Sequence, residues 1–210
     1  MTLSRKIAAV EESQTLALTR IANQLKAQGG NIVSMTAGEP DFPTPDHVKE
    51  AAIAAIRDNF THYTANAGIP ERVAAVREKF GRDNGLKFET PQILVSSGAK
   101  HSIFNALLAI CNPGDEVIVP APYWVSYPEM VKIADATPVI LQTSRESGYK
   151  MTPGALRGAI TPRSKVLILN SPSNPTGSVY TRRELEGLAE VVASSGLYVI
   201  SDEIYEKILY

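Results

Sequence analysis

From residue 92 onward, the sequence alternates between short apolar runs and amphipathic segments with a helical period. The apolar runs are rich in valine, isoleucine and leucine, and we expect strands at residues 92–97, 115–120, 137–142, 165–170 and 197–201. Such alternation predicts an α/β domain with a mainly parallel sheet and helices on both faces. In sheets of this kind, ligands bind beyond the carboxyl ends of the strands.

Helix signals fill much of the remaining chain. We expect helices at residues 13–28, 45–58, 70–84, 99–110 and 127–134, two more starting near residues 152 and 181, and a short strand at 31–35. Thr44 followed by Pro45 has the pattern of an N-cap and first helical residue, and Gly85 should end the helix before it. The stretch T-R-R-E that starts at Thr181 is a capping box.

Composition excludes several classes of protein. Hydrophobic residues make up 44% and charged residues 20% of 210 residues, which favours a packed core over disorder. The formal net charge is −1, so neither a nucleic-acid surface nor a polybasic membrane surface is indicated. Cys111 is the single cysteine, which rules out a disulfide or a cysteine metal cluster within these residues. No apolar run is long enough for a membrane span, and we expect a cytoplasmic protein.

Polar and aromatic residues follow four of the expected strands. The stretch S-S-G-A-K, ending at Lys100, opens a helix, where first-turn N–H groups could bind a phosphate, although an ordinary turn explains it equally well. Trp124, the only tryptophan, could stack on an aromatic ligand or simply pack in a core. Asn170 and Asn174 lie in the loop S-P-S-N-P-T-G and could donate to a ligand, although asparagine before proline is also common in turns.

Asp202 ends the last apolar run. A carboxylate in that position is costly to desolvate unless a cation or donor meets it. Its partner could be a remote arginine or the protonated ring nitrogen of a cofactor. A helix start for a phosphate, an indole for a ring, amide and phenol donors and this acid together describe a site for pyridoxal phosphate, whose pyridinium nitrogen is kept protonated by a buried carboxylate.

The motifs also resemble a known family. T-A-G-E-P-D-F, H-Y-T-A-N-A-G-I-P-E, S-S-G-A-K, D-E-V-I-V-P-A-P-Y-W-V-S-Y-P-E-M, N-S-P-S-N-P-T-G and S-D-E-I-Y-E occur in the order seen in the fold-type I, class I aminotransferases. The resemblance is greatest to the bacterial aspartate aminotransferase branch and spans most of the chain. Arg72 departs from the family pattern, which usually has an apolar residue there.

The resemblance implies roles for residues around the cofactor ring. Asp202 pairs with the pyridinium nitrogen, and Tyr205 hydrogen-bonds the phenolic oxygen. Asn174 reaches the same oxygen and helps to hold the substrate α-carboxylate, and Trp124 stacks on the ring and borders the substrate. Tyr127 is expected only to pack beside Trp124.

It implies further roles at the phosphate and the substrate. Backbone N–H groups of Gly98, Ala99 and Lys100 would hold the cofactor phosphate. Tyr63 would contact the phosphate of a neighbouring subunit, which implies a homodimer with shared active sites. Gly38 would line the substrate carboxylate pocket, a role compatible with a simple turn. Lys100 would face the side-chain carboxylate of acidic substrates, and its alternative is a solvent-facing helix position.

Two groups that such an enzyme needs are missing from these motifs. The family's Schiff-base lysine and its carboxylate-binding arginine both lie beyond S-D-E-I-Y, and none of the ten lysines here occupies such a motif. We therefore expect an N-terminal half that is inactive alone, either part of a longer sequence or a natural fragment. Residues 1–30 would be an N-terminal arm and helix contributed to the small domain, and residues 31–210 an incomplete cofactor-binding large domain.

The expected activity is transfer of an amino group between an amino acid, aspartate or glutamate, and a 2-oxo acid. An aspartate/prephenate aminotransferase is one alternative. A lyase with the same fold and cofactor, or a ligand-binding regulator, is another.

Overall fold

The computed structural model describes residues 3–36 and 38–209. They divide into two compact units. One combines Met1–Gln14 with Gly98–Tyr210, and the other is Thr15–Ser97. Each unit is described by itself. Among the described residues, no helix combines the length and apolar character that crossing a bilayer requires.

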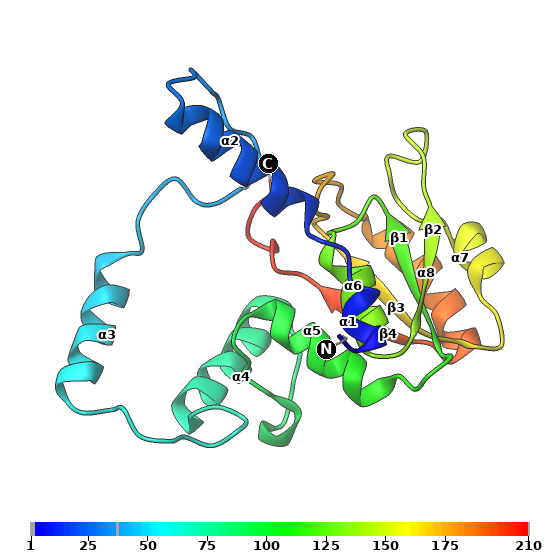
Figure 1. Cartoon of the computed structure of the whole chain (residues 1–210). Coiled ribbons are helices and arrows are strands. Elements are labelled where there is room, and N and C mark those ends of the chain that lie inside the picture. Colours follow the sequence, from blue (N-terminus) through cyan, green and yellow to red (C-terminus); the bar gives the residue numbers. More distant parts are fainter. Residues whose placement is uncertain (1–2, 37, 210) are drawn as a thin grey trace. The chain divides into compact units, whose positions relative to one another are not determined.

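A four-stranded parallel sheet is the centre of the first unit (Figure 1). Its strands are β1 (Glu116–Ala121), β2 (Thr137–Gln142), β3 (Ser164–Asn170) and β4 (Tyr198–Asp202), in the order β2-β1-β3-β4. The register pairs Asn170 with Asp202, so the last residues of β3 and β4 lie side by side. The predicted parallel α/β fold is confirmed, and the sheet delivers two of the predicted polar residues to the same edge.

Helices cover both faces of this sheet. One core cluster joins β1 and β3 to α5 (Ala99–Ile110) and α6 (Ser126–Ile133), and the other joins them to α7 (Pro153–Ala159) and α8 (Arg182–Ser195). Alternation along β1 produces this division, since Val117 and Val119 belong to the first cluster and Ile118 to the second. Each such fully buried side chain contributes about 1.5–3 kcal/mol to stability.

The first unit also includes the start of the chain. Helix α1 (Arg5–Ala8) is followed by residues that contact α6. Lys6 forms an ion pair with Asp135, and the Glu11 N–H donates to the Glu129 carboxylate at 3.0 Å. The assignment of residues 1–30 to a small domain stays a prediction. The contacts show that residues 6–11 are bonded to α6 and to Asp135 just after it.

The second unit contains α2 (Gln14–Ala27), α3 (Asp46–Arg57), α4 (Pro70–Asn84) and the 3₁₀ helix η1 (Thr90–Gln92). Gly85 ends α4 as predicted, with a left-handed backbone at φ 67° and its N–H bonded to the Phe80 carbonyl. Helix α3 begins one residue later than predicted. Pro45, not Thr44, is its N-cap, because Pro45 retains an extended backbone.

Two predicted strands are wrong. Residues 31–35 and 92–97 are irregular in the structure, apart from the end of η1. An apolar run becomes a strand only when a neighbouring strand completes its hydrogen bonds, and neither run pairs with another strand among the described residues. Val95 instead donates its N–H to the Ala67 carbonyl at 2.9 Å, whereas Val33 and Met35 are largely exposed.

The capping box predicted at the start of α8 is present. Thr181 Oγ1 accepts from the Glu184 N–H, and the Glu184 carboxylate accepts from the Thr181 N–H. Lys150 completes the arrangement with an ion pair to Glu184 at 2.5 Å. The Lys150 ammonium first, and then the Thr181 N–H, lower the pKa of Glu184 to about 2.

This ion pair predicts a specific acid sensitivity. The folded-state pKa of Glu184 is depressed, so its stabilising contribution is complete above the unfolded value of about 4.3 and is lost as the pH falls toward 2. We expect Lys150→Met to weaken the dependence of the urea unfolding midpoint on pH within that window. Arg182→Met is the control, because its long 3.8 Å contact with Glu186 is exposed. An unchanged pH dependence in Lys150→Met would contradict the assignment.

Candidate functional site

A hollow lies where β3 and β4 end, next to the first turn of α5. The empty space within it, part of which is open to solvent, is about 400 Å³. Its lining residues all come from the first unit and are Ala99, Lys100, Trp124, Tyr127, Asn170, Asn174, Asp202, Ile204 and Tyr205. Six of these residues were predicted to be cofactor- or substrate-binding residues, from four separate stretches of sequence.

Asp202 is the buried acid of the hollow, with 9% of its surface exposed. Its Oδ2 accepts a hydrogen bond of 2.5 Å from the Tyr127 hydroxyl, and its Oδ1 accepts one of 3.2 Å from the Ile204 N–H. No lysine or arginine among the described residues forms an ion pair with it, so the structure does not supply the remote arginine considered as its partner. Neutral donors therefore offset the cost of burying this carboxylate.

The loop after β3 is held against Asp202 by Asn170. The Asn170 side chain donates to the Asp202 carbonyl at 2.9 Å and accepts from the Asn174 N–H at 2.7 Å. Asn174 in turn donates to the Tyr205 hydroxyl at 3.4 Å. The peptide bonds before Pro172 and Pro175 are cis. Both the NH₂ group and the carbonyl oxygen of the Asn170 side chain are therefore bonded within the protein. The Asn174 amide and the Tyr205 hydroxyl are bonded to each other, and both residues line the hollow.

Aromatic rings form the wall opposite the loop. Trp124 and Tyr127 meet edge to face, with centroids 5.4 Å apart and planes at 90°. Lys100 places its Nζ 4.7 Å from the centroid of the Trp124 ring, in a cation–π contact. Lys100 and Trp124, each predicted separately as a site residue, therefore lie together, with the ammonium over the indole.

Tyr127 has a larger role in the structure than the sequence analysis gave it. It does pack on Trp124 as predicted, but it also joins Asp202 directly. Its burial, and then the bond to the Asp202 carboxylate, raise the pKa of the Tyr127 phenol, which therefore remains a proton donor. Two features of the sequence could have indicated this bond. Tyr127 comes three residues after Trp124, and Asp202 ends an apolar run with no basic residue next to it.

The first turn of α5 borders the hollow at Ala99 and Lys100. Gly98 is the N-cap of α5 at φ 91°, a backbone conformation that favours glycine, and no side chain caps this helix. The first N–H groups of a helix have no partner within it and, with the helix dipole, suit an anion. The predicted phosphate-binding stretch from Gly98 to Lys100 has the backbone geometry that this role requires.

Two predicted site residues belong to the other unit. Tyr63 has a fully exposed ring, and Gly38 has no neighbouring atom within 4 Å of the place a Cβ would occupy. Both roles stay predictions.

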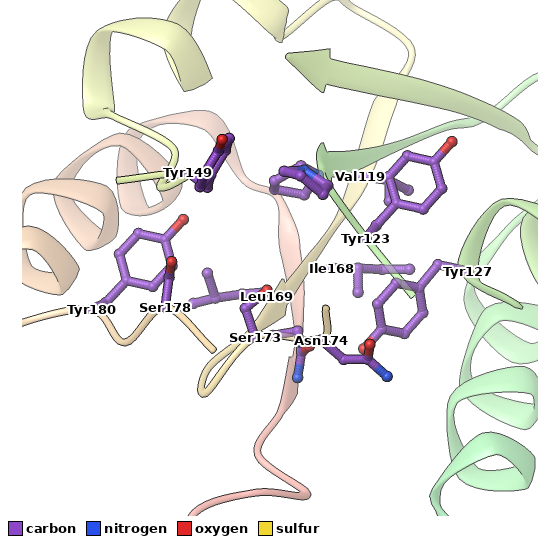
Figure 2. Close-up of a pocket in the computed structure, with 13 residues that line it drawn as sticks. Val119, Tyr123, Tyr127, Tyr149, Ile168, Leu169, Ser173, Asn174, Ser178 and Tyr180 are labelled. Atoms are coloured by element: carbon purple, nitrogen blue, oxygen red, sulfur yellow. The ribbon is translucent and has the colours of Figure 1, made fainter. Parts of the chain in front are cut away.

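A second hollow of about 400 Å³ lies between the ends of β1 and β3, where the chain changes direction across the sheet. Figure 2 shows Tyr123 and Tyr127 at one end of it and Tyr149 and Tyr180 at the other. Tyr180 accepts a hydrogen bond of 2.7 Å from the Met151 N–H. Tyr127, Asn170 and Asn174 line both hollows, so these residues form the wall between them. The sequence analysis did not predict this space.

A parallel sheet with this set of residues at its carboxyl edge agrees with the comparisons with known proteins. The family model for aminotransferases of class I and II matches residues 30–210, and the chain belongs to this family. An aspartate aminotransferase from Geobacillus stearothermophilus is 46% identical over the whole chain, which covers 53% of that protein. An aspartate/prephenate aminotransferase from Cereibacter sphaeroides is 51% identical over 99% of the chain and 52% of its own length.

Solved structures agree. The chain superposes on the aspartate aminotransferase from Thermus thermophilus with maleate at a TM-score of 0.96 and 49% identity, covering 55% of that chain. For the enzyme from Rhizobium meliloti, the TM-score is 0.96 and the identity 42%, over 53% of that chain. The present chain thus spans about half the length of the relatives it matches.

Pyridoxal phosphate is the cofactor of this family, and the donors in the hollow fit it. An aromatic face, a buried carboxylate that pairs with no cation among the described residues, an amide bonded to a phenol, and a helix start without a side-chain cap fit its ring, ring nitrogen, phenolic oxygen and phosphate.

Proposed function

We propose that this chain is the cofactor-binding part of an aminotransferase that moves an amino group between aspartate or glutamate and a 2-oxo acid. The observation that carries the proposal is Asp202, a buried carboxylate that is held by neutral donors and lines the same hollow as Trp124, Asn174 and Tyr205. A carboxylate in this state is suited to hold a protonated ring nitrogen.

Each residue has a part in holding the cofactor. Asp202 would pair with the ring nitrogen, Trp124 would stack on the ring, and Tyr205 with Asn174 would bond the phenolic oxygen. Gly98, Ala99 and Lys100 would give their N–H groups to the phosphate. When bound, the cofactor supplies an electron sink for the negative charge that develops at the substrate α-carbon.

Other groups would recognise the substrate. Asn174 and Gly38 would bind the α-carboxylate, Trp124 would border the substrate, and the Lys100 ammonium would meet the side-chain carboxylate. The names of the relatives from Geobacillus stearothermophilus and Cereibacter sphaeroides, both of which include aspartate, support an acidic substrate. We expect the lysine that moves the α-proton, and the second carboxylate-binding group, in the further length of the full protein.

The relative from Cereibacter sphaeroides favours a second candidate acceptor. Its name includes prephenate, and it is 51% identical to the chain. Prephenate carries a carboxylate on its ring as well as a 2-oxo acid, so Lys100 could meet either acceptor. Assaying both 2-oxoglutarate and prephenate with aspartate as donor separates the two.

A cytoplasmic homodimer is also part of the proposal. The complete exposure of the Tyr63 ring supports a role at a subunit boundary, where its hydroxyl would reach a neighbouring subunit's phosphate. Light scattering on the purified full-length protein would give its mass in solution, and a monomer that retains full activity would contradict shared active sites. Cell fractionation would test the location.

The main test is an amino-transfer assay of the full-length protein with pyridoxal phosphate. We expect glutamate to form from aspartate and 2-oxoglutarate, and no transfer by the 210-residue chain alone. Cofactor binding without transfer to either acceptor would contradict the proposal and favour a lyase or a ligand-binding regulator.

A further inference from the structure

The carboxylate of Asp202 is held on two sides by groups of different kinds. The Ile204 N–H is part of the backbone directly after β4, whereas the Tyr127 hydroxyl comes from α6, 75 positions earlier in the sequence. The backbone donor moves together with Asp202, because the two residues are only two positions apart in the chain. Among the residues that the structure describes, Tyr127 alone ties the carboxylate to a different element of the site.

The Tyr127 phenol itself has little freedom. Its residue is 2% exposed, it belongs to the core cluster under α5 and α6, and its ring meets Trp124 edge to face. Because the hydroxyl keeps its proton, the 2.5 Å contact is an O–H···O⁻ bond with an ionised acceptor. Bonds of this kind are shorter and stronger than neutral ones, and they favour the charged form of the acid.

The other groups around Asp202 do not provide this function. From α5, Lys100 lies over the Trp124 ring, and the end of β3 contributes only the neutral amides Asn170 and Asn174. Tyr205 is bonded to Asn174, and the Glu203 carboxylate accepts from the Ser201 hydroxyl at 2.6 Å. Within the described residues, Tyr127 is thus the one side chain that donates a hydrogen bond to the Asp202 carboxylate.

We propose that Tyr127 is a positioning residue for the cofactor, whose hydroxyl holds the Asp202 carboxylate in place for the ring nitrogen. This inference rests on the proposed function. Each carboxylate oxygen can accept two hydrogen bonds, and Tyr127 and Ile204 occupy one position on each. The remaining positions are open to the hollow that Asp202 lines. Trp124 and Asp202 then keep a fixed relation, because both contact the same tyrosine.

The test is Tyr127→Phe in the full-length protein, a change that keeps the ring and removes the hydroxyl. In the cofactor-free protein at one fixed pH, carbon-13 NMR of labelled aspartate should show the Asp202 carboxylate resonance displaced from its wild-type position, because the hydrogen bond from Tyr127 is lost. The dissociation constant of pyridoxal phosphate should rise about tenfold, the effect of losing one hydrogen bond to a charged group.

Tyr180→Phe is the matched control. It makes the same chemical change at a partly buried tyrosine of this unit, one whose hydroxyl accepts from the Met151 N–H instead of bonding Asp202. We expect it to leave both the Asp202 carboxylate resonance and the cofactor affinity unchanged. The effect of Tyr127→Phe on affinity should also be smaller when Asp202 is already asparagine, because the Tyr127 hydroxyl then has no charged acceptor.

The outcomes separate this inference from the proposed function. A wild-type protein that does not bind pyridoxal phosphate would defeat the proposed function, whereas the Asp202 carboxylate resonance would still report on Tyr127. Equal results for Tyr127→Phe and Tyr180→Phe, in a protein that binds the cofactor, would overturn the inference alone. If Tyr127→Phe does not fold, site-specific 3-fluorotyrosine at position 127 keeps the packing and makes the phenol a stronger hydrogen-bond donor. The Asp202 carboxylate resonance should then move from its wild-type position, and an unchanged resonance would overturn the inference.

Discussion

Asp202→Asn in the full-length protein should lower kcat for aspartate by about 100- to 10,000-fold, the range seen when a group that transfers protons or stabilises charge is lost. Asparagine has nearly the shape of aspartate but no negative charge. It therefore cannot keep the ring nitrogen of the cofactor protonated, and the electron sink is lost. The measurement is steady-state amino transfer at saturating pyridoxal phosphate.

The same change should leave the fold largely intact. Asp202 accepts from both the Tyr127 hydroxyl and the Ile204 N–H, whereas an asparagine has only one acceptor oxygen for these two donors. One donor is left without an acceptor, at a cost of about 1–3 kcal/mol in unfolding free energy. This cost is small compared with the expected loss of activity.

Glu203→Gln is the matched control for Asp202→Asn. It removes the neighbouring carboxylate, which is exposed and bonded to the Ser201 hydroxyl, and it should leave kcat within about twofold of the wild type, as expected for a surface change. Asp202→Asn with more than a tenth of the wild-type kcat would show that the hollow does not hold the ring nitrogen as proposed.

The strands from residue 115 onward could be predicted because each signal is local. β2 coincides with its predicted residues, and β1, β3 and β4 lie within one residue of theirs at either end. An apolar run that is bounded by turn residues and followed by a capped helix is strongly predicted to be a strand. Residues 31–35 and 92–97 have a similar composition but no strand partner in the described residues. Whether a partner strand is present depends on distant residues, so the sequence of the run does not predict it.

The candidate site was predictable to the extent that it lies at strand ends. Asp202 and Asn174 follow apolar strands, so the edge where they meet could be inferred from the sheet alone. The bond between Tyr127 and Asp202 could not, because the two residues are 75 positions apart and on different elements. Spacing predicts which face of a helix a side chain occupies, but it does not predict which distant residue that side chain meets.

Lys100→Met should change substrate selectivity more than overall activity. Lys100 is exposed at the first turn of α5 and lines the hollow, with its ammonium over the Trp124 ring. If it meets the side-chain carboxylate of the substrate, its loss removes a charge-assisted hydrogen bond worth about 1.5–3 kcal/mol. We therefore expect kcat/KM for aspartate to fall about 10- to 100-fold, whereas kcat/KM for phenylalanine, which has no such carboxylate, should change by less than about threefold.

Steady-state kinetics with both amino donors, at one fixed concentration of 2-oxoglutarate, would measure this difference. Lys165→Met is the control, because Lys165 pairs with Asp115 at the opposite end of the sheet from the hollow. Equal losses for aspartate and phenylalanine in Lys100→Met would show that the ammonium does not recognise the substrate side chain. A fall for aspartate only would place the ammonium at the substrate carboxylate, and the backbone N–H, which the substitution retains, would remain available to the phosphate.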